Sequence, residues 1–295
     1  MNTVMKTRVV PVYYDRACKV IFSENRDVLI KFLSELLHRN IDSNAKIIIG
    51  KEAVGKYING KTFRHDMIIS INDKEFICFE MNANKYAYSI NRNFIYLIDY
   101  LLSKLPKNIK VTDLNDYRVE LLNLNMFGNV SDEVLEEATL EYSHSKRKAT
   151  EMIKIIDFNI AKCYDMMYNE DVEKSKIIRW GSIFKAETIE EISDLLGDDL
   201  LTMEEKERFL NSIRAVNGDE EIVAAYRNER NERWKRESIE NGLREEGLKE
   251  GKEKGKEENT ISIIKSMLNK KTDYKFISEI TGKTIEEIKE IENNM

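Results

Sequence analysis

The 295-residue sequence predicts an α/β domain with a mixed sheet flanked by helices, followed by an all-helical C-terminal appendage. Short apolar runs with strand periodicity alternate with longer amphipathic runs of helical periodicity, which is typical of an α/β domain. Near residue 217 the composition changes to a dense mixture of acidic and basic residues. We therefore expect a domain over residues 1–215 and an appendage over residues 216–295.

The predicted elements of the domain follow one another in the order expected of a compact α/β fold. Apolar residues recur at helical spacing over residues 15–40 and again over residues 88–105, where Pro106 ends the helix. The other expected elements are a strand at 45–49, a hairpin at 65–82, a strand at 118–127, a helical region at 132–170 and one or two helices at 186–215.

The predicted hairpin brings two acidic residues into register. Two apolar runs flank the polar triplet Asn72-Asp73-Lys74, a pattern typical of a β-hairpin. With this triplet as the loop, Ile71 pairs with Glu75, and counting outward places Asp66 opposite Glu80. A two-residue loop would instead shift the register by one residue and separate the two acids.

Directly opposed residues share one face of a hairpin, with Cβ atoms about 4.5–5.5 Å apart. Two carboxylates at this separation repel each other unless a cation lies between them. Asn82 follows Glu80 at the strand period and joins it on the same face. We therefore expect a hard-metal site of oxygen ligands near Asp66 and Glu80. The alternative is that both acids are ordinary polar positions of a half-buried hairpin.

The composition argues against several classes of protein. The net charge of −6 gives no overall basic character, so DNA binding would depend on a local patch. The three cysteines are isolated and the three histidines are scattered, which disfavours zinc spacing and multi-histidine sites. No apolar run of about 18 residues occurs, and the N-terminus lacks the apolar segment of a signal peptide. We expect a cytoplasmic protein with reduced thiols and no membrane partner.

The appendage opens with a mixed-charge helix over residues 227–258, where basic and acidic residues are equally numerous. Gly247, Gly251 and Gly255 fall on one face of this helix, and each costs about 1 kcal/mol relative to alanine. They indicate either close helix–helix approach in a homodimer or a flexible linker. The last 35 residues predict a small bundle of short helices, in which Thr284 and Glu287 form a capping box.

Four motifs in order resemble the recombination-promoting nucleases of the Rpn type, also called PD-(D/E)XK family transposases. Asp66, followed by Glu80-Met81-Asn82, resembles the D…(D/E)xK signature of the wider nuclease superfamily. The segment Asp15-Arg16-Ala17-Cys18-Lys19 is similar to the family's D-x-x-F-K. The segment Glu80-Met81-Asn82…Arg92…Tyr96 is similar to the family's E-M-Q…R…Y. A glycine-spaced segment such as Glu246-Gly247-Leu248-Lys249-Glu250-Gly251 also recurs in the family.

This resemblance implies a restriction-endonuclease-like fold and a metal-dependent DNA endonuclease of the recombination-promoting, transposase-like type. Asp66 and Glu80 would hold Mg²⁺, with Mn²⁺ or Ca²⁺ as other candidates, helped by the backbone carbonyl of Met81. Asn82 occupies the position of the superfamily's lysine and of the family's usual glutamine. Its amide can orient a water molecule but carries no charge.

The resemblance also implies roles for nearby cations. Lys85 or Lys19 would supply the positive charge that Asn82 lacks, and Arg92 would contact a DNA phosphate through its guanidinium group. Asp15 would be an accessory residue at the mouth of the site. The alternatives are a surface salt bridge between Asp15 and Lys19, at i,i+4 spacing, and an ordinary helix-surface charge for Arg92.

Two other functions stay open on the sequence. The chain would act as a DNA- or protein-binding module if Asn82 does not support turnover, or as a helical interaction protein if the carboxylates have no role. For the nuclease, a homodimer formed through the C-terminal helices would let two sites act on two strands.

Overall fold

The computed structural model describes residues 8–49, 65–83, 90–127, 132–169 and 173–295. Contacts divide the chain into two compact units, Met1–Tyr226 and Arg227–Met295. The first unit contains the sheet and the second contains only helix. The predicted fold class, a mixed sheet flanked by helices with a helical C-terminal region, is confirmed.

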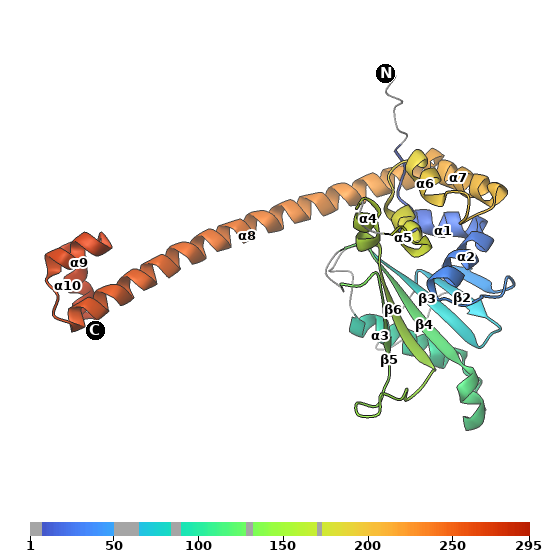
Figure 1. Ribbon diagram of the computed structural model, residues 1–295, viewed down its shortest axis with the longest axis horizontal. Coiled ribbons are helices and arrows are strands. Elements are labelled where there is room, and N and C mark those ends of the chain that lie inside the picture. The colour runs from blue at the N-terminus through green and yellow to red at the C-terminus, as the bar shows by residue number, and fades with distance from the viewer. Residues whose placement is uncertain (1–7, 50–64, 84–89, 128–131, 170–172) are drawn as a thin grey trace, which may run out of the picture. The chain divides into compact units, whose positions relative to one another are not determined.

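The first unit is built on a six-stranded sheet in the order β1-β2-β3-β4-β6-β5 (Figure 1). The strands are β1 (Lys46–Ile49), β2 (Met67–Ile71), β3 (Glu75–Asn82), β4 (Arg118–Asn125), β5 (Leu135–Thr139) and β6 (Ile153–Asn159). β3, β4 and β6 are parallel neighbours, whereas β1, β2 and β5 pair antiparallel with theirs. The carboxyl ends of the three parallel strands therefore meet at one end of the sheet, the usual place for a site in an α/β fold.

Helices cover both faces of this sheet (Figure 1). One face shares its apolar core with α1 (Asp15–Glu24), α2 (Arg26–Leu36), α4 (Ile160–Met167) and α5 (Lys176–Lys185). α6 (Ile189–Leu196) and α7 (Met203–Gly218) extend this core by packing on α5 and α1. The other face packs against α3 (Ile90–Lys104), which ends before Pro106 as expected, and a short 3₁₀ helix (Val111–Asp116) precedes β4. The apolar residues of β3 and β4 alternate between the two cores, as the strand period requires.

The hairpin of β2 and β3 has the predicted register. Ile71 pairs with Glu75, which leaves residues 72–74 as the loop. Asn72 and Asp73 adopt φ values of 49° and 57°. Left-handed backbone at both central positions suits a hairpin turn, and Asn and Asp tolerate it better than other non-glycine residues.

The helix expected over residues 132–170 is wrong for most of its length. The segment forms β5 and β6, and only α4 is helical. Ile155 and Ile156 show why, because they enter the cores on opposite faces of the sheet. Adjacent apolar residues fit a strand buried on both faces as well as a helix, and the β-branched isoleucines favour the strand. The next helix, α5, was not predicted.

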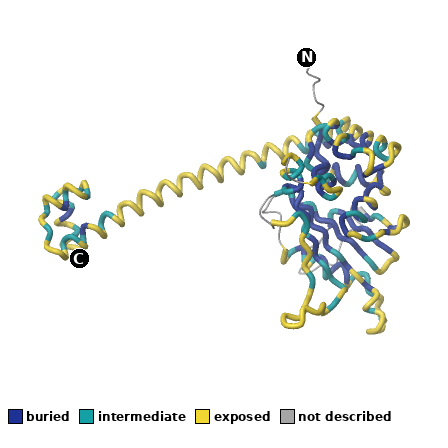
Figure 2. The backbone as a smooth tube through the Cα atoms, viewed as in Figure 1, coloured by how far each residue is buried: buried dark blue, intermediate teal, exposed yellow. Residues whose placement is uncertain are grey.

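The charged segment is continuous helix. α8 (Glu220–Asn269) runs without a break across Gly247, Gly251 and Gly255, and every residue from 234 to 259 is exposed (Figure 2). Beyond the backbone of the helix itself, a Cβ added at any of these three glycines would meet no described atom within 4 Å. No packing contact in the described part of the chain therefore requires glycine there.

The second unit ends in a small helical bundle, as predicted. α9 (Tyr274–Thr281) and α10 (Ile285–Asn293) pack with the end of α8 around the buried residues Ile264, Ile277 and Ile288. The predicted capping box of Thr284 and Glu287 is confirmed at the start of α10. In the described part of the chain, no helix combines the length and the apolar character that a membrane span needs.

Candidate functional site

Asp66 lies immediately before β2 and is held from two sides. Its Oδ2 accepts a hydrogen bond from the Met81 backbone N–H at 2.7 Å. Its Oδ1 lies 3.6 Å from the Nζ of Lys19 in α1. The backbone N–H of Asp66 donates to the carbonyl of Phe79 at 3.2 Å, which ties the residue to β3. The side chain is therefore fixed between β3 and the first helix.

Glu80 is buried in β3, with 6% of its surface exposed. Its Oε1 lies 2.8 Å from Nδ1 of His65, the residue that precedes Asp66. His65 is itself buried and packs edge-on against the rings of Tyr96 and Tyr100 from α3. We call Asp66 and Glu80, together with their cationic neighbours Lys19 and His65, the carboxylate corner.

The two carboxylates of the corner influence each other electrostatically. Burial raises the pKa of Asp66 to about 7, and the negative charges of Glu80 and Asp15 add to this effect. The Met81 N–H and Lys19 oppose the rise only in part. Asp66 lies outside the strand ladder, and its contacts are Met81 and Lys19 rather than His65. The two acids are thus neighbours. Asp66 precedes the first residue of β2, however, so the alternation of side chains along a strand does not by itself place it on the same face as Glu80.

The pKa values of both cationic neighbours are raised, which favours their charged forms. Burial opposes the charge of His65, but Cys78 and the Glu80 carboxylate raise its pKa to about 10. Burial likewise opposes the charge of Lys19, but Asp15, at 2.6 Å, and Asp66 raise its pKa. Lys19 therefore joins the predicted accessory acid Asp15 to the corner.

The oxygens of the corner suit a hard divalent cation. Mg²⁺ is usually bound through one or two carboxylates with several retained waters. The repulsion that raises the pKa of Asp66 is the effect that such a cation would relieve. Within the described ranges, no group of three His, Cys, Asp or Glu side chains is placed to bind a metal ion. A cation here would depend on Asp66, Glu80 and the oxygens of backbone and water.

Asn82, at the end of β3, belongs to a buried chain of amides. Its Nδ2 donates to Oδ1 of Asn125 at 2.9 Å and lies 3.5 Å from Oδ1 of Asn123. Both of these β4 residues donate through Nδ2 to Oδ1 of Asp157 in β6, at 3.0 and 3.1 Å. The contacts follow the parallel register, in which Asn82 lies beside Asn125 and Asn123 beside Asp157.

Helix α3 contributes two more residues to this hydrogen-bonded group. Asn93 is fully buried and donates through Nδ2 to Oδ1 of Asn123 at 2.9 Å. Arg92 donates from Nε to Oδ1 of Asn93 at 3.1 Å, and its guanidinium carbon lies 5.7 Å from the ring centre of Tyr96. Arg92 is thus joined to the site, while its contact with a phosphate stays a prediction. We call Asn82, Asn93, Asn123, Asn125 and Asp157 the amide network.

Most of the predicted site residues lie close together. The structure brings together Asp15, Lys19, Asp66, Glu80 and Met81, and it places Asn82 and Arg92 in or beside the amide network. Lys85 lies outside the described residues.

Several neighbours were not predicted, namely His65, Asn93, Asn123, Asn125 and Asp157. Asn123 and Asn125 offered a signal, because two amides interrupt an otherwise apolar strand at the strand period. Asp157 was hidden by the wrong helix assignment over its segment.

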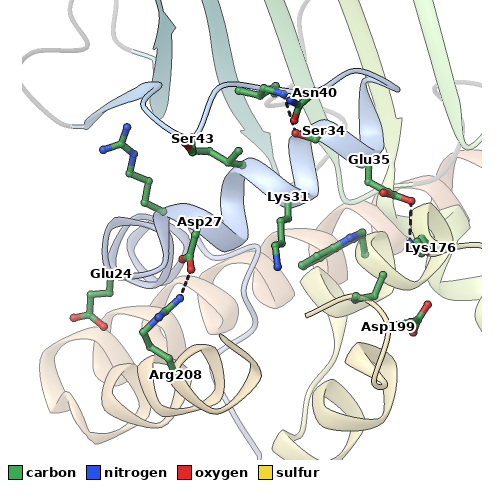
Figure 3. A pocket seen from close by; sticks show the side chains of 15 residues that line it. Glu24, Asp27, Lys31, Ser34, Glu35, Asn40, Ser43, Lys176, Asp199 and Arg208 are labelled. Carbon is green, nitrogen blue, oxygen red and sulfur yellow. Dashed lines mark hydrogen bonds and ion pairs between the residues drawn. The ribbon is translucent and has the colours of Figure 1, made fainter. Parts of the chain in front are cut away.

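The largest of the described cavities, about 820 Å³, lies elsewhere, beside α2 and α5 (Figure 3). Some of its charged lining residues pair with each other, as Asp27 does with Arg208 and Glu35 with Lys176. None of the predicted site residues lines it. The cavity is therefore separate from the carboxylate corner.

Comparison with known proteins gives one result. Residues 12–242 match the family described as PD-(D/E)XK nuclease family transposase, a span that includes the carboxylate corner and the amide network. No curated protein and no solved structure matches the chain. Because the family match extends over far more than half of the sequence, this chain belongs to the PD-(D/E)XK nuclease family transposases.

Proposed function

We propose that the protein is a metal-dependent DNA endonuclease that hydrolyses phosphodiester bonds, with the carboxylate corner as its active site. Membership of the family supports a nuclease-like function. The observation that carries the finer proposal is the proximity of two acids, Asp66 and Glu80, each with its own cationic anchor. Burial and then the charge of Glu80 raise the pKa of Asp66.

Each residue of the corner has a distinct role in this proposal. Asp66 and Glu80 hold Mg²⁺, or Mn²⁺ or Ca²⁺, together with the Met81 carbonyl. When bound, such a cation supplies an activated water and neutralises charge on the scissile phosphate. His65 keeps the Glu80 carboxylate in place through their 2.8 Å contact. Lys19 adds positive charge beside Asp66, which compensates for the neutral Asn82 at the superfamily's lysine position.

A plasmid assay tests this function. Purified protein with Mg²⁺ or Mn²⁺ should nick supercoiled plasmid, and Asp66→Ala and Glu80→Ala should each reduce nicking to background. Asp116→Ala is the matched control, because Asp116 is an exposed acid whose described ion-pair partner is the surface residue Lys74. Cleavage that survives in both site variants would contradict the proposal.

Asn82 favours a second candidate, a nuclease fold that binds DNA or protein without turnover. An amide has neither the charge nor the transferable proton of a lysine. DNA binding without cleavage, with Mg²⁺ and with Mn²⁺, would support this candidate over the first. If Asn82→Lys then produced cleavage in a protein otherwise without it, the missing charge would be identified as the cause.

We further propose that the active form is a homodimer that contacts DNA and assembles through the C-terminal helices. The exposed glycine face of α8 supports this, because among the described residues no side chain or other segment occupies the space beside it. Truncation after residue 240, followed by a mass measurement in solution, tests the proposal. An unchanged oligomeric state would show that the tail does not hold the assembly together.

A further inference from the structure

The hydrogen bonds of the amide network have a direction that is set at its acidic end. Asp157 Oδ1 accepts from the side-chain amides of Asn123 and Asn125 at 3.0 and 3.1 Å. An ionised carboxylate can only accept hydrogen bonds, whereas an asparagine presents a donor on one side and an acceptor on the other. Both asparagines must therefore turn Nδ2 toward Asp157 and Oδ1 away from it.

This direction continues to Asn82. The Oδ1 of Asn125 faces Asn82 and receives its Nδ2 at 2.9 Å. If the Asn82 amide were turned over, two carbonyl oxygens would face each other in a buried setting without a proton between them. The network thus uses the side-chain nitrogen of Asn82, while its side-chain oxygen Oδ1 accepts no hydrogen bond from the residues that the structure describes.

The opposite end of the network has the same direction. A guanidinium group can only donate hydrogen bonds. Arg92 donates to the oxygen of Asn93, so Asn93 in turn donates its Nδ2 to Asn123 at 2.9 Å. Asn123 then donates to Asp157. Hydrogen bonds therefore run from a cation on α3 to a carboxylate on β6, and no asparagine between them is free to reverse.

We propose that Asp157, acting through Asn125, is a positioning residue that turns the side-chain oxygen Oδ1 of Asn82 toward the active site. Asn82 then serves as a neutral oxygen ligand for a divalent cation held by Asp66 and Glu80, directly or through a bound water. This is the reverse of a lysine, which can only donate. The inference rests on the proposed function, because it assumes a cation at the carboxylate corner.

The test measures cation affinity without any cleavage reaction. Mn²⁺ binding to the full-length protein is followed by the loss of the free-ion electron paramagnetic resonance signal. Asp157→Leu keeps a similar size but removes the oxygen that accepts from both Asn123 and Asn125, so nothing at this end holds the Asn125 amide in one direction. Outer-shell partners of metal sites typically change affinity by about 10–100-fold, so we expect the Kd for Mn²⁺ to rise at least tenfold.

Two further variants separate positioning from simple loss of structure. Asn125→Ala cuts the link between Asp157 and Asn82 and should weaken Mn²⁺ binding as Asp157→Leu does. Asn25→Ala removes an equally buried amide outside the network, where it donates to Ser212 and to the Ile21 carbonyl, so it should lower the melting temperature and leave the Kd unchanged. Circular dichroism confirms folding of each variant before titration.

A double variant gives the sharpest comparison. In Asn82→Asp both side-chain oxygens are acceptors, so the direction of the amides no longer decides which atom the site receives. Asp157→Leu should then change the Kd for Mn²⁺ by less than about twofold in this background, against at least tenfold in the native one. Equal effects in the two backgrounds would overturn the inference.

The outcomes also distinguish this inference from the proposed function. If Asp66→Ala abolishes Mn²⁺ binding while Asp157→Leu and Asn125→Ala leave it unchanged, the metal site stands and the positioning role is wrong. If the unmodified protein binds no Mn²⁺, or binds it equally well after Asp66→Ala and Glu80→Ala, the proposed site and this inference are both wrong.

Discussion

The carboxylate corner and the amide network are neighbouring groups on β3 that differ in their charge. The corner concentrates charge, with two acids and two cations around a local hairpin. The network is almost neutral, with four amides and one carboxylate linked across three parallel strands and a helix. Like charges are costly to bury together, whereas amides satisfy one another. The corner is thus suited to binding an added cation, whereas the network keeps one arrangement of hydrogen bonds without a cation.

The largest expected loss of stability comes from breaking the buried pair of the corner. His65→Phe leaves the Glu80 carboxylate buried without its partner, which should lower the free energy of unfolding by about 3 kcal/mol. Urea denaturation at pH 7 measures it, with His144→Phe as an exposed control expected to stay within about 0.5 kcal/mol. Because the pKa of His65 is raised to about 10, its contribution is complete at low pH and disappears as the pH rises through that value. A loss of unfolding free energy no larger than that of His144→Phe would show that the His65–Glu80 pair does not stabilise the fold.

The second-largest change in stability is expected on adding or removing metal, which distinguishes the carboxylate corner from the amide network. At a Mg²⁺ concentration of 100 times the Kd, the native protein should gain about 2.7 kcal/mol of stability, and a chelator should reverse the gain. Asp66→Asn and Glu80→Gln should abolish it, because each removes a charged ligand. Urea denaturation with and without Mg²⁺ measures the gain. Equal stabilisation of both variants would place the cation elsewhere.

Damage to the amide network should cost somewhat less. Asn123→Leu removes a fully buried amide that links Asn93 to Asp157, and it should lower the free energy of unfolding by about 2 kcal/mol. The control is Leu121→Ala on the same strand, where the loss comes from a cavity. The two variants should differ in Mn²⁺ affinity, which only Asn123→Leu is expected to reduce. A stable Asn123→Leu protein with native affinity would contradict a role for the network.

The smallest expected effect is a change in how stability depends on pH. The pKa of Asp66 is raised to about 7, so its uncharged form is favoured by folding. The metal-free protein should therefore lose stability relative to Asp66→Asn as the pH rises from the ordinary carboxyl range through about 7. Melting temperatures from pH 5 to pH 8 measure the difference, and saturating Mg²⁺ should remove or reverse it. A parallel pH dependence of the two metal-free proteins would mean that folding does not raise the pKa of Asp66.

Sequence reasoning predicted one of these regions and missed the other. Asp66 and Glu80 were found because a hairpin is a local structure whose register follows from the length of its loop. The pairing of Lys19 with Asp15 was accessible for the same reason, since the two are one helical turn apart. Asn123 and Asn125 were visible as unusual residues of an apolar strand, but nothing nearby in the chain indicates what they contact.

The sequence by itself determined the hairpin, its turn, the capping of the last helix and the presence of two acids with a definite spacing. These features depend on contacts between residues close in the chain, where backbone geometry leaves few alternatives. Only the tertiary structure decided that β4 and β6 lie beside β3, that His65 anchors Glu80, and that Asp157 directs the amide of Asn82. Parallel pairing joins distant segments through connections of variable length, so its partners and register follow from packing of the whole sheet.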